Sequence, residues 1–172
     1  MISGPSGAGK GTLVREVLQR IPDAWVSISA TTRPPRPGER DGVEYHFLSK
    51  EEFRALIDED GLLEWAEVFG NYYGTPRREA QEHISMGDQV LLEIDVQGGE
   101  QVKRALPEAV LVFVEPPSLE ELKSRLVNRG SESEQQIDER LRHAGHEMAI
   151  ADSYDHRVVN DELSGAVAEF VG

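Results

Sequence analysis

The sequence contains no cysteine, which excludes a disulfide framework and any metal site built on thiolates. It also lacks an apolar run of about 18 residues and a charged segment leading into an apolar one, so we expect neither a membrane span nor a secretory signal. No low-complexity tract or repeat interrupts its 172 residues, of which 38% are hydrophobic and 29% charged. These features indicate a globular protein with one core, which we expect in the cytoplasm.

Positive charge is scarce. The formal net charge is −14, with 18 basic residues against 32 acidic ones. Because a polyanion would be repelled by this mean field, we expect no nucleic-acid partner. Only four of the basic residues are lysines, and several arginines gather in loop segments. The planar guanidinium of arginine suits bidentate binding of phosphate, so these clusters are candidates for anion sites.

The segment GPSGAGKGT closely matches the phosphate-binding loop G-x-x-x-x-G-K-[ST]. Gly4, Gly9 and Lys10 are in register, whereas Gly11 stands where a hydroxyl usually follows the lysine. In such a loop the glycines let backbone N–H groups surround the β-phosphate, and the lysine reaches the β and γ oxygens. The predicted residues for binding a nucleoside triphosphate are Gly4, Pro5, Ser6, Gly7, Ala8, Gly9, Lys10, Gly11 and Thr12.

Hydrophobic periodicity predicts strands that alternate with helices. Strands are predicted at residues 25–29, 62–69, 89–96, 109–115 and 156–159, and helices at 13–20, 51–59, 77–86, 119–126 and 135–151, with a further helix at the C-terminal end. Residues 71–76, NYYGTP, are predicted to form a turn. The alternation indicates an α/β fold with a parallel sheet, in which ligands bind at the carboxyl ends of the strands. The three residues before the loop are too few to cross a sheet, so we expect further residues upstream.

A second constellation lies in the proline-rich segment SATTRPPRPGERDGVEYHF. Arg33 and Arg36 stand on a chain that proline stiffens, so little entropy is lost when they close on an anion, and the Tyr45 hydroxyl is able to join them. This arrangement predicts a second phosphate site. The alternative is that the two arginines pair with acids such as Glu39 and Asp41.

The pattern T-T-R-x-x-R-x-G-E-x-x-G-x-x-Y-x-F, found here at residues 31–47 after a phosphate loop, resembles the signature of the guanylate kinase family. The likeness continues through EWAEVFGNYYGTP, LEIDVQGG, RLVNRGSESE and VVND, and covers essentially the whole chain. It implies a parallel-sheet P-loop kinase core at residues 1–30 and 76–172, an inserted GMP-binding lobe at 31–75, and a helical lid at about 125–142. It also implies transfer of the γ-phosphoryl of ATP to GMP and dGMP, with Mg²⁺.

The resemblance implies the residues that bind the acceptor. The residues expected to bind the phosphate of GMP are Arg33, Arg36, Tyr45 and Tyr73. Those expected to bind the guanine are Ser29, Glu64 and Thr75. A carboxylate at Glu64 accepts from the N1–H and 2-amino groups of guanine, whereas adenine would leave it unpaired at a cost of about 1–3 kcal/mol. On the residues alone, a strand-edge acid is the favoured interpretation of Glu64, so its role in reading the base rests on the resemblance.

The same resemblance implies the residues that act on the donor. The lid arginines match Arg129 and Arg140, which with Lys10 are the predicted catalytic residues, and Asn160 matches a position near the adenine of ATP. Arg125 either joins the lid arginines or pairs with Glu121 four residues before it.

Two acids alternate on the predicted strand at 89–96 and should face the same side at its carboxyl end. Asp95 resembles the acid that orients magnesium, often through water, in phosphate-loop enzymes, and Thr12 offers a hydroxyl to the same ion. Glu93 is assigned to the GMP side, with a structural hydrogen bond as the alternative. The five histidines show no metal spacing and are interpreted as structural or surface residues.

Two other functions stay open from the sequence. One is a related kinase with another monophosphate acceptor, against which Ser29, Glu64 and Thr75 argue. The other is a non-catalytic guanylate-kinase-like binding domain, against which the intact Lys10 and glycines of the loop argue. The sequence does not decide between a monomer and a homo-oligomer.

Overall fold

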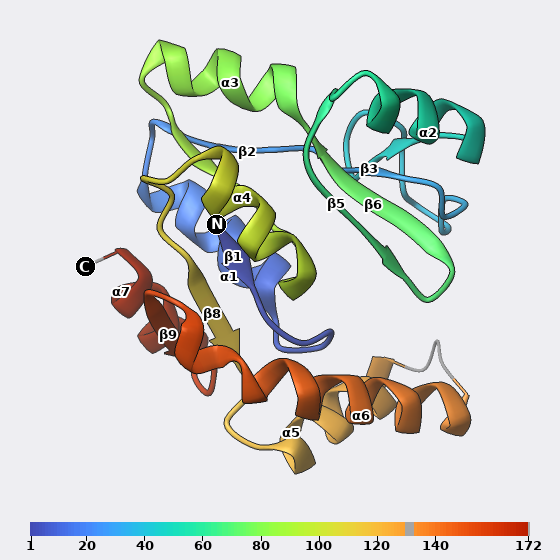
Figure 1. Cartoon of the computed structure of the whole chain (residues 1–172). Coiled ribbons are helices and arrows are strands. Elements are labelled where there is room, and N and C mark those ends of the chain that lie inside the picture. Colours follow the sequence, from blue (N-terminus) through green and yellow to red (C-terminus); the bar gives the residue numbers. More distant parts are fainter. Residues whose placement is uncertain (130–132, 172) are drawn as a thin grey trace. The chain divides into compact units, whose positions relative to one another are not determined.

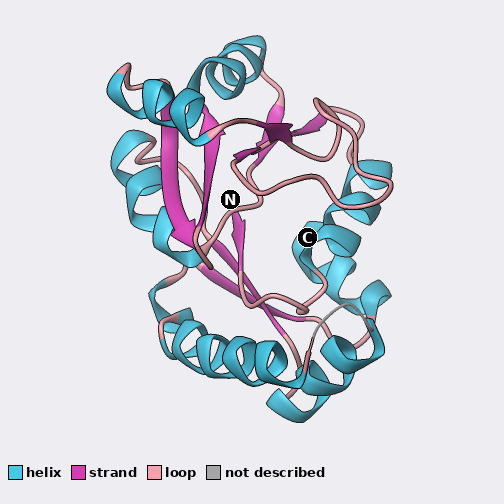
Figure 2. Cartoon of the chain, turned by 90° about the vertical axis from the view of Figure 1, so that its right-hand side faces the viewer, coloured by secondary structure: helices cyan, strands magenta, loops and turns pink. Residues whose placement is uncertain are grey.

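The computed structural model describes residues 1–129 and 133–171 (Figure 1). The chain divides into two compact units. The middle unit comprises Met1 and Asp23–Ala109, and the terminal unit comprises Ile2–Pro22 and Val110–Gly172. Both units contain strands and helices, which are magenta and cyan in Figure 2.

The terminal unit is built on a three-stranded parallel sheet of order β1-β8-β9. Its strands are β1 (Ile2–Ser3), β8 (Val112–Glu115) and β9 (His156–Val159). Its helices are α1 (Lys10–Arg20), α5 (Leu119–Arg129), α6 (Glu134–Ala149), η2 (Ala151–Ser153) and α7 (Leu163–Val171). Although β1 is only two residues long, both residues pair with β8, so the phosphate loop leaves the sheet as expected.

Helices α5 and α6 pack against each other (Figure 1). Their contact is apolar and consists of Leu122, Leu126, Ile137 and Ala144. Ser133 begins α6 with a capping box, in which its hydroxyl accepts from Gln136 N–H and the Gln136 side chain accepts from Ser133 N–H. This cap fixes where the second helix of the expected lid starts.

The middle unit contains a two-stranded parallel sheet and a separate four-stranded sheet of order β4-β3-β6-β5. The first consists of β2 (Ala24–Val26) and β7 (Gln89–Leu91), and the second of β3 (Ala30–Thr31), β4 (His46–Phe47), β5 (Leu62–Val68) and β6 (Asn71–Pro76). Its helices are α2 (Lys50–Asp58), α3 (Arg77–Met86), η1 (Val96–Gly98) and α4 (Gly99–Ala105). Buried Phe53 of α2 packs with Ala30 and Leu62 of the four-stranded sheet.

Residues 71–76 form strand β6, so the turn predicted there is wrong. The chain reverses two residues earlier, at Phe69 and Gly70, whose φ angles of 49° and 77° are both positive. Two consecutive residues with positive φ form a type I′ hairpin turn, which matches the right-handed twist of the flanking strands. Asn71 and Gly74, residue types that are common in turns, instead pair with Val68 and Trp65 of β5.

The parallel α/β arrangement is confirmed, and most predicted helices and strands are present within a few residues. The strand predicted at 89–96 is shorter, because its ladder with β2 ends at Leu91. Glu93 and Asp95 therefore lie beyond the end of β7 instead of on it. None of the described helices is long and apolar enough to cross a membrane.

Candidate active site

The phosphate loop of the terminal unit joins β1 to α1 and takes a conformation that requires glycine. Gly4, Gly7 and Gly9 have φ angles of 138°, 95° and 91°, which L side chains rarely adopt. A Cβ on Gly4 would also overlap the carbonyl oxygen of Val114 in the neighbouring strand β8. The loop is thus pressed against the sheet and turned so that its backbone is available to an anion.

Helix α1 follows the loop with its first turn open to a ligand. Gly9 is its N-cap residue and supplies no side-chain hydrogen bond, and no acidic residue lies in the first turn. The backbone N–H groups of this first turn and the positive end of the helix dipole therefore favour a phosphate there. Lys10 lies beside them, and its Nζ donates to the carbonyl oxygens of Gly4, at 2.6 Å, and Pro5, at 3.2 Å.

Helix α6 of the expected lid contacts the phosphate loop through Arg140. Its Nη1 donates to the hydroxyl of Ser6 over 2.8 Å. The structure therefore brings this predicted catalytic arginine to the loop that is expected to hold the triphosphate. Arg129, the other lid arginine, ends α5, but its side chain lies outside the described part of the chain.

Asn160 and Arg125 support the loop from behind. The Asn160 side chain is buried, and its Nδ2 donates to the carbonyl oxygen of Ala8 over 2.7 Å. Nη2 of Arg125 donates to the Asn160 carbonyl oxygen over 3.0 Å, while Nε donates to Glu121 Oε1 over 3.0 Å. Arg125 makes the helix-face ion pair that was one of its two expected roles, and the same side chain is tied to the loop through Asn160.

In the middle unit, Arg33 meets the acid that was its alternative partner. Nη1 and Nη2 of Arg33 donate to the two carboxylate oxygens of Glu39, over 3.0 and 2.9 Å. Glu39 Oε2 also accepts from the backbone N–H of Arg36 over 2.7 Å, so this carboxylate shapes the proline-rich loop. Burial lowers the pKa of Arg33, but the hydrogen bond and charge of Glu39 outweigh it, and the pKa is raised. Arg36 itself is exposed.

The other predicted phosphate-binding residues gather around Arg33. Its guanidinium lies over the ring of Tyr45, 5.3 Å from the centroid, and the Tyr45 and Tyr73 rings meet edge to face at 6.1 Å. Burial raises the pKa of Tyr45, and the nearby charge of Glu93 raises it further. Tyr45, Tyr73 and Glu93 thus lie near Arg33 in the same unit.

Glu64 is a buried carboxylate, only 4% exposed. Its Oε1 accepts from the hydroxyl of Thr75, its cross-strand neighbour, over 2.7 Å. A bulge between Leu62 and Glu64 places one extra residue in β5, and as a result Leu62, Leu63 and Glu64 are all buried. Burial, reinforced by the charge of Asp95 and opposed by the Thr75 hydrogen bond, raises the pKa of Glu64 to about 7.

Asp95 fits a role beside magnesium, but the described residues offer no complete metal cage. Its Oδ1 accepts from Gln97 N–H over 3.0 Å, which orients the carboxylate at the start of η1. Among residues 1–129 and 133–171 no group of three or more potential acidic, histidine or cysteine ligands is found. Magnesium retains water and phosphate ligands in such sites, so one carboxylate suffices. Thr12 Oγ1 is exposed and accepts from Arg15 Nη2 over 3.1 Å.

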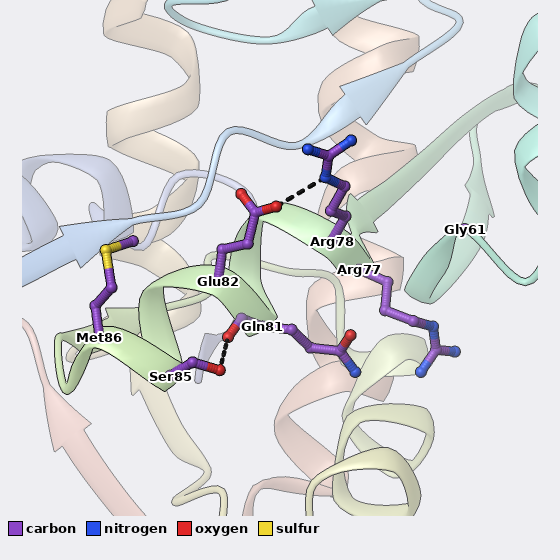
Figure 3. A pocket seen from close by; sticks show the side chains of 7 residues that line it. All are labelled: Gly61, Arg77, Arg78, Gln81, Glu82, Ser85 and Met86. Atoms are coloured by element: carbon purple, nitrogen blue, oxygen red, sulfur yellow. Dashed lines mark hydrogen bonds and ion pairs between the residues drawn. The ribbon is translucent and has the colours of Figure 1, made fainter.

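A surface hollow of about 570 Å³ lies on α3 (Figure 3). It is lined by Gly61, Arg77, Arg78, Gln81, Glu82, Ser85 and Met86. Its two arginines already have partners, since Arg77 Nη2 donates to Asp60 Oδ1 and Arg78 Nε to Glu82 Oε1, each over 2.8 Å. The hollow contains none of the predicted site residues.

Sequence reasoning missed the residues that support Glu64 from behind. Gly98 lies against its carboxylate, and the Gln101 side chain binds the backbone of Trp65, the next residue of β5. Only the Gly-Gly pair in LEIDVQGG hinted at close packing there.

Ser29 is half-buried, and its carbonyl oxygen accepts from His46 N–H over 2.9 Å.

Comparison with known proteins identifies the family. The sequence model of guanylate kinase matches residues 1–171. A guanylate kinase of Gloeobacter violaceus is 56% identical over 167 residues, which are 97% of this chain and 82% of that protein. A guanylate kinase of Desulfitobacterium hafniense is 53% identical over 97% of this chain and 84% of its own length.

Solved structures agree. The crystal structure of guanylate kinase from Anaplasma phagocytophilum matches with a TM-score of 0.80 and 32% identity, over 99% of this chain and 80% of that one. Shikimate kinase from Bacteroides thetaiotaomicron, at 13% identity and a TM-score of 0.52, shares the fold alone. The P-loop kinase fold predicted from the sequence is therefore confirmed, and the chain belongs to the guanylate kinase family.

Proposed function

We propose that this kinase transfers the γ-phosphoryl of ATP to GMP, and also to dGMP, giving ADP and GDP or dGDP. The observation that carries the choice of acceptor is the buried pair of Glu64 and Thr75. A carboxylate removed from water and held by one hydroxyl is an acceptor in need of donors, and the N1–H and 2-amino groups of guanine supply two. Adenine presents a lone pair at N1 and would leave the carboxylate unsatisfied.

The acceptor phosphate would bind between Arg33, Arg36, Tyr45 and Tyr73. Arg33 is held by Glu39, so its guanidinium is already ordered and little entropy is lost when it meets an anion. A guanidinium has five donors, of which Glu39 occupies two and the Pro34 carbonyl oxygen a third, so at most two are left for phosphate oxygens. The GMP phosphate is itself the nucleophile and is ionised at neutral pH, so no general base is needed.

The donor would bind at the phosphate loop and the start of α1. Backbone N–H groups bind the β-phosphate, Lys10 moves from the Gly4 and Pro5 carbonyls to the β and γ oxygens, and Asn160 keeps the loop in place. Arg140, already in contact with Ser6, stabilises charge on the transferred phosphoryl, and Arg129 has the same proposed role. Closure of these arginines over both nucleotides excludes water and so prevents hydrolysis of ATP.

Mg²⁺ is the proposed cofactor, and Asp95 would hold it through water, with the Thr12 hydroxyl as a further candidate. When bound with ATP, the ion neutralises negative charge on the β and γ oxygens. The partners we propose are ATP and GMP, without nucleic acid. A cytoplasmic location and the division into core, lobe and lid stay predictions.

A coupled assay of ADP release across nucleoside monophosphates tests the proposal. GMP and dGMP should be turned over. AMP should be slower by at least about 100-fold because the N1 edge of adenine offers no donor to the Glu64 carboxylate, and UMP should be slower because uracil offers only its N3–H. Equal turnover of AMP or UMP would show a related kinase with another acceptor. Binding of GMP without ADP release at saturating ATP and Mg²⁺ would show a non-catalytic domain.

A further inference from the structure

The segment η1–α4 approaches Glu64 so closely that a Cβ on Gly98 would displace the Glu64 carboxylate. Gly98 is buried, with φ −74° and ψ −19°, a helical conformation that any residue adopts. A Cβ there would lie 3.0 Å from Cδ of Glu64 and closer still to its Oε2. Glycine is therefore needed at this position because it has no side chain that would occupy the space of the carboxylate. The backbone conformation itself does not require glycine.

The same segment also holds the backbone of β5. Gln101 of α4 accepts from Trp65 N–H through Oε1, over 3.2 Å, and donates to the Trp65 carbonyl oxygen through Nε2, over 2.8 Å. Strand β5 is at the edge of its sheet, so these two backbone groups have no strand to pair with. The Gln101 amide thus makes the two backbone hydrogen bonds that a neighbouring strand would make, and it fixes Trp65, the residue next to Glu64.

We propose that Gly98 and Gln101 are positioning residues that set the place of the Glu64 carboxylate and thereby the selectivity of the kinase for guanine. Gly98 fixes how far the carboxylate extends toward η1, and Gln101 fixes the strand that carries it. Neither residue needs to touch the nucleotide. The inference rests on the proposed role of Glu64 as the base-reading group.

Gly98→Ala is the direct test, with Gly165→Ala as its matched control, because a Cβ on Gly165 in α7 meets nothing within 4 Å. The readout is kcat/KM for GMP and for IMP, which keeps N1–H and lacks the 2-amino group. Displacing the carboxylate should lower kcat/KM for GMP on the order of 10- to 100-fold, the range for losing a hydrogen bond to a charged group. IMP should lose less, so the GMP/IMP ratio falls, whereas Gly165→Ala should leave the ratio unchanged.

A double-mutant cycle with Glu64→Ala tests the role of Glu64 in reading guanine separately from the role of Gly98 in positioning it. Glu64→Ala removes the atoms that a Cβ on Gly98 would meet, so Gly98→Ala should cause no further fall in the ratio in that background. If Glu64→Ala leaves the GMP/IMP ratio unchanged, the role proposed for Glu64 is wrong. The positioning role is wrong if Glu64→Ala lowers the GMP/IMP ratio and Gly98→Ala does not. It is also wrong if the fall in the ratio for the double variant is the product of the falls for the two single variants.

Gln101→Met provides a second, independent test that does not insert an atom into the packed contact. Methionine has a similar length but neither donates to nor accepts from the Trp65 backbone as an amide does. We expect a smaller fall in the GMP/IMP ratio, about 3- to 10-fold, from two neutral hydrogen bonds. A lower melting temperature with an unchanged ratio would mean that Gln101 only stabilises the fold, and would overturn its part of the proposal.

Discussion

Replacing Glu64 with glutamine should make the folded protein more stable at alkaline pH while it weakens binding of GMP. Burial raises the pKa of Glu64 from 4.5 to about 7, so the folded state holds this proton more tightly than the unfolded chain does. The stability that the protonated carboxyl contributes is fully present below about pH 4.5 and is lost as pH rises through about 7. With 1.36 kcal/mol for each pH unit between the two pKa values, the loss is about 3 kcal/mol.

Glutamine has nearly the same shape and keeps the oxygen that accepts from Thr75, but it does not ionise. The free energy of unfolding of Glu64→Gln minus that of the unchanged protein should therefore grow by about 3 kcal/mol between about pH 4.5 and about pH 8.5. Urea unfolding followed by circular dichroism measures it. Glu67→Gln, which removes an exposed carboxylate from the same strand, is the control. A difference for Glu64→Gln that stays constant across this range would refute the reasoning.

Titration of Glu64 should also appear in the pH dependence of catalysis, where the ionised form is the favourable one. Guanine needs the ionised carboxylate, so kcat/KM for GMP should fall as pH drops below about 7, and this limb should be missing in Glu64→Gln. Ionised Glu64 thus costs stability when the site is empty and is repaid when guanine donates its two hydrogens.

Three further changes test the donor side and the helix of the lid. Lys10→Met should abolish turnover while GMP binding, measured by calorimetry, persists, because no residue proposed to bind GMP lies in the loop; unchanged GDP formation would remove Lys10 from the mechanism. Arg140→Ala should lower kcat on the order of 10²- to 10³-fold, with a smaller change in KM for GMP. A loss below tenfold would show that the contact with Ser6 is only structural. Gly145→Ala should raise the free energy of unfolding by about 1 kcal/mol, seen as a higher melting temperature, because the added Cβ meets nothing within 4 Å inside α6; a lower melting temperature would contradict this.

Local patterns in the sequence were sufficient for the helices and for the parallel strands. Helix α3 occupies the predicted residues, and it stops at Gly87, whose φ of 89° is the left-handed conformation that glycine favours at a helix end. Strand β9 also matches its prediction. In both segments the periodicity and the terminating residue agree with the packing, so tertiary contacts did not override them.

The hairpin and its bulge were not predictable in the same way. Asn71 and Gly74 are typical turn residues, yet the type I′ turn falls on Phe69 and Gly70, because the pairing of β5 with β6 decides which residues reverse the chain. The bulge that turns Glu64 inward depends on the register of the two strands, and nothing in the local sequence EWAE specifies it.

The site residues show a similar division. The phosphate loop could be predicted because its function depends on a fixed local spacing. Around Arg33, the residues alone left a choice between a phosphate and Glu39, and the structure shows the ion pair with Glu39. Gly98 and Gln101 were missed because their partners, Glu64 and Trp65, lie more than thirty residues earlier in the chain, and no local pattern marks such contacts.

The bond from Asn160 to Ala8 joins residues 152 positions apart and bears on how the protein is made. The loop also rests on β8, which pairs with β1 only after Val112 has been synthesised. During synthesis the loop therefore emerges before β9, and it is held in place only once Asn160, which follows β9, has been made. Contacts of such long range make for slow folding, so the nascent chain gains its nucleotide site among its last steps. A ribosome-bound chain that ends before residue 160 should accordingly show no protection of the loop by ATP in limited proteolysis, whereas the released chain should.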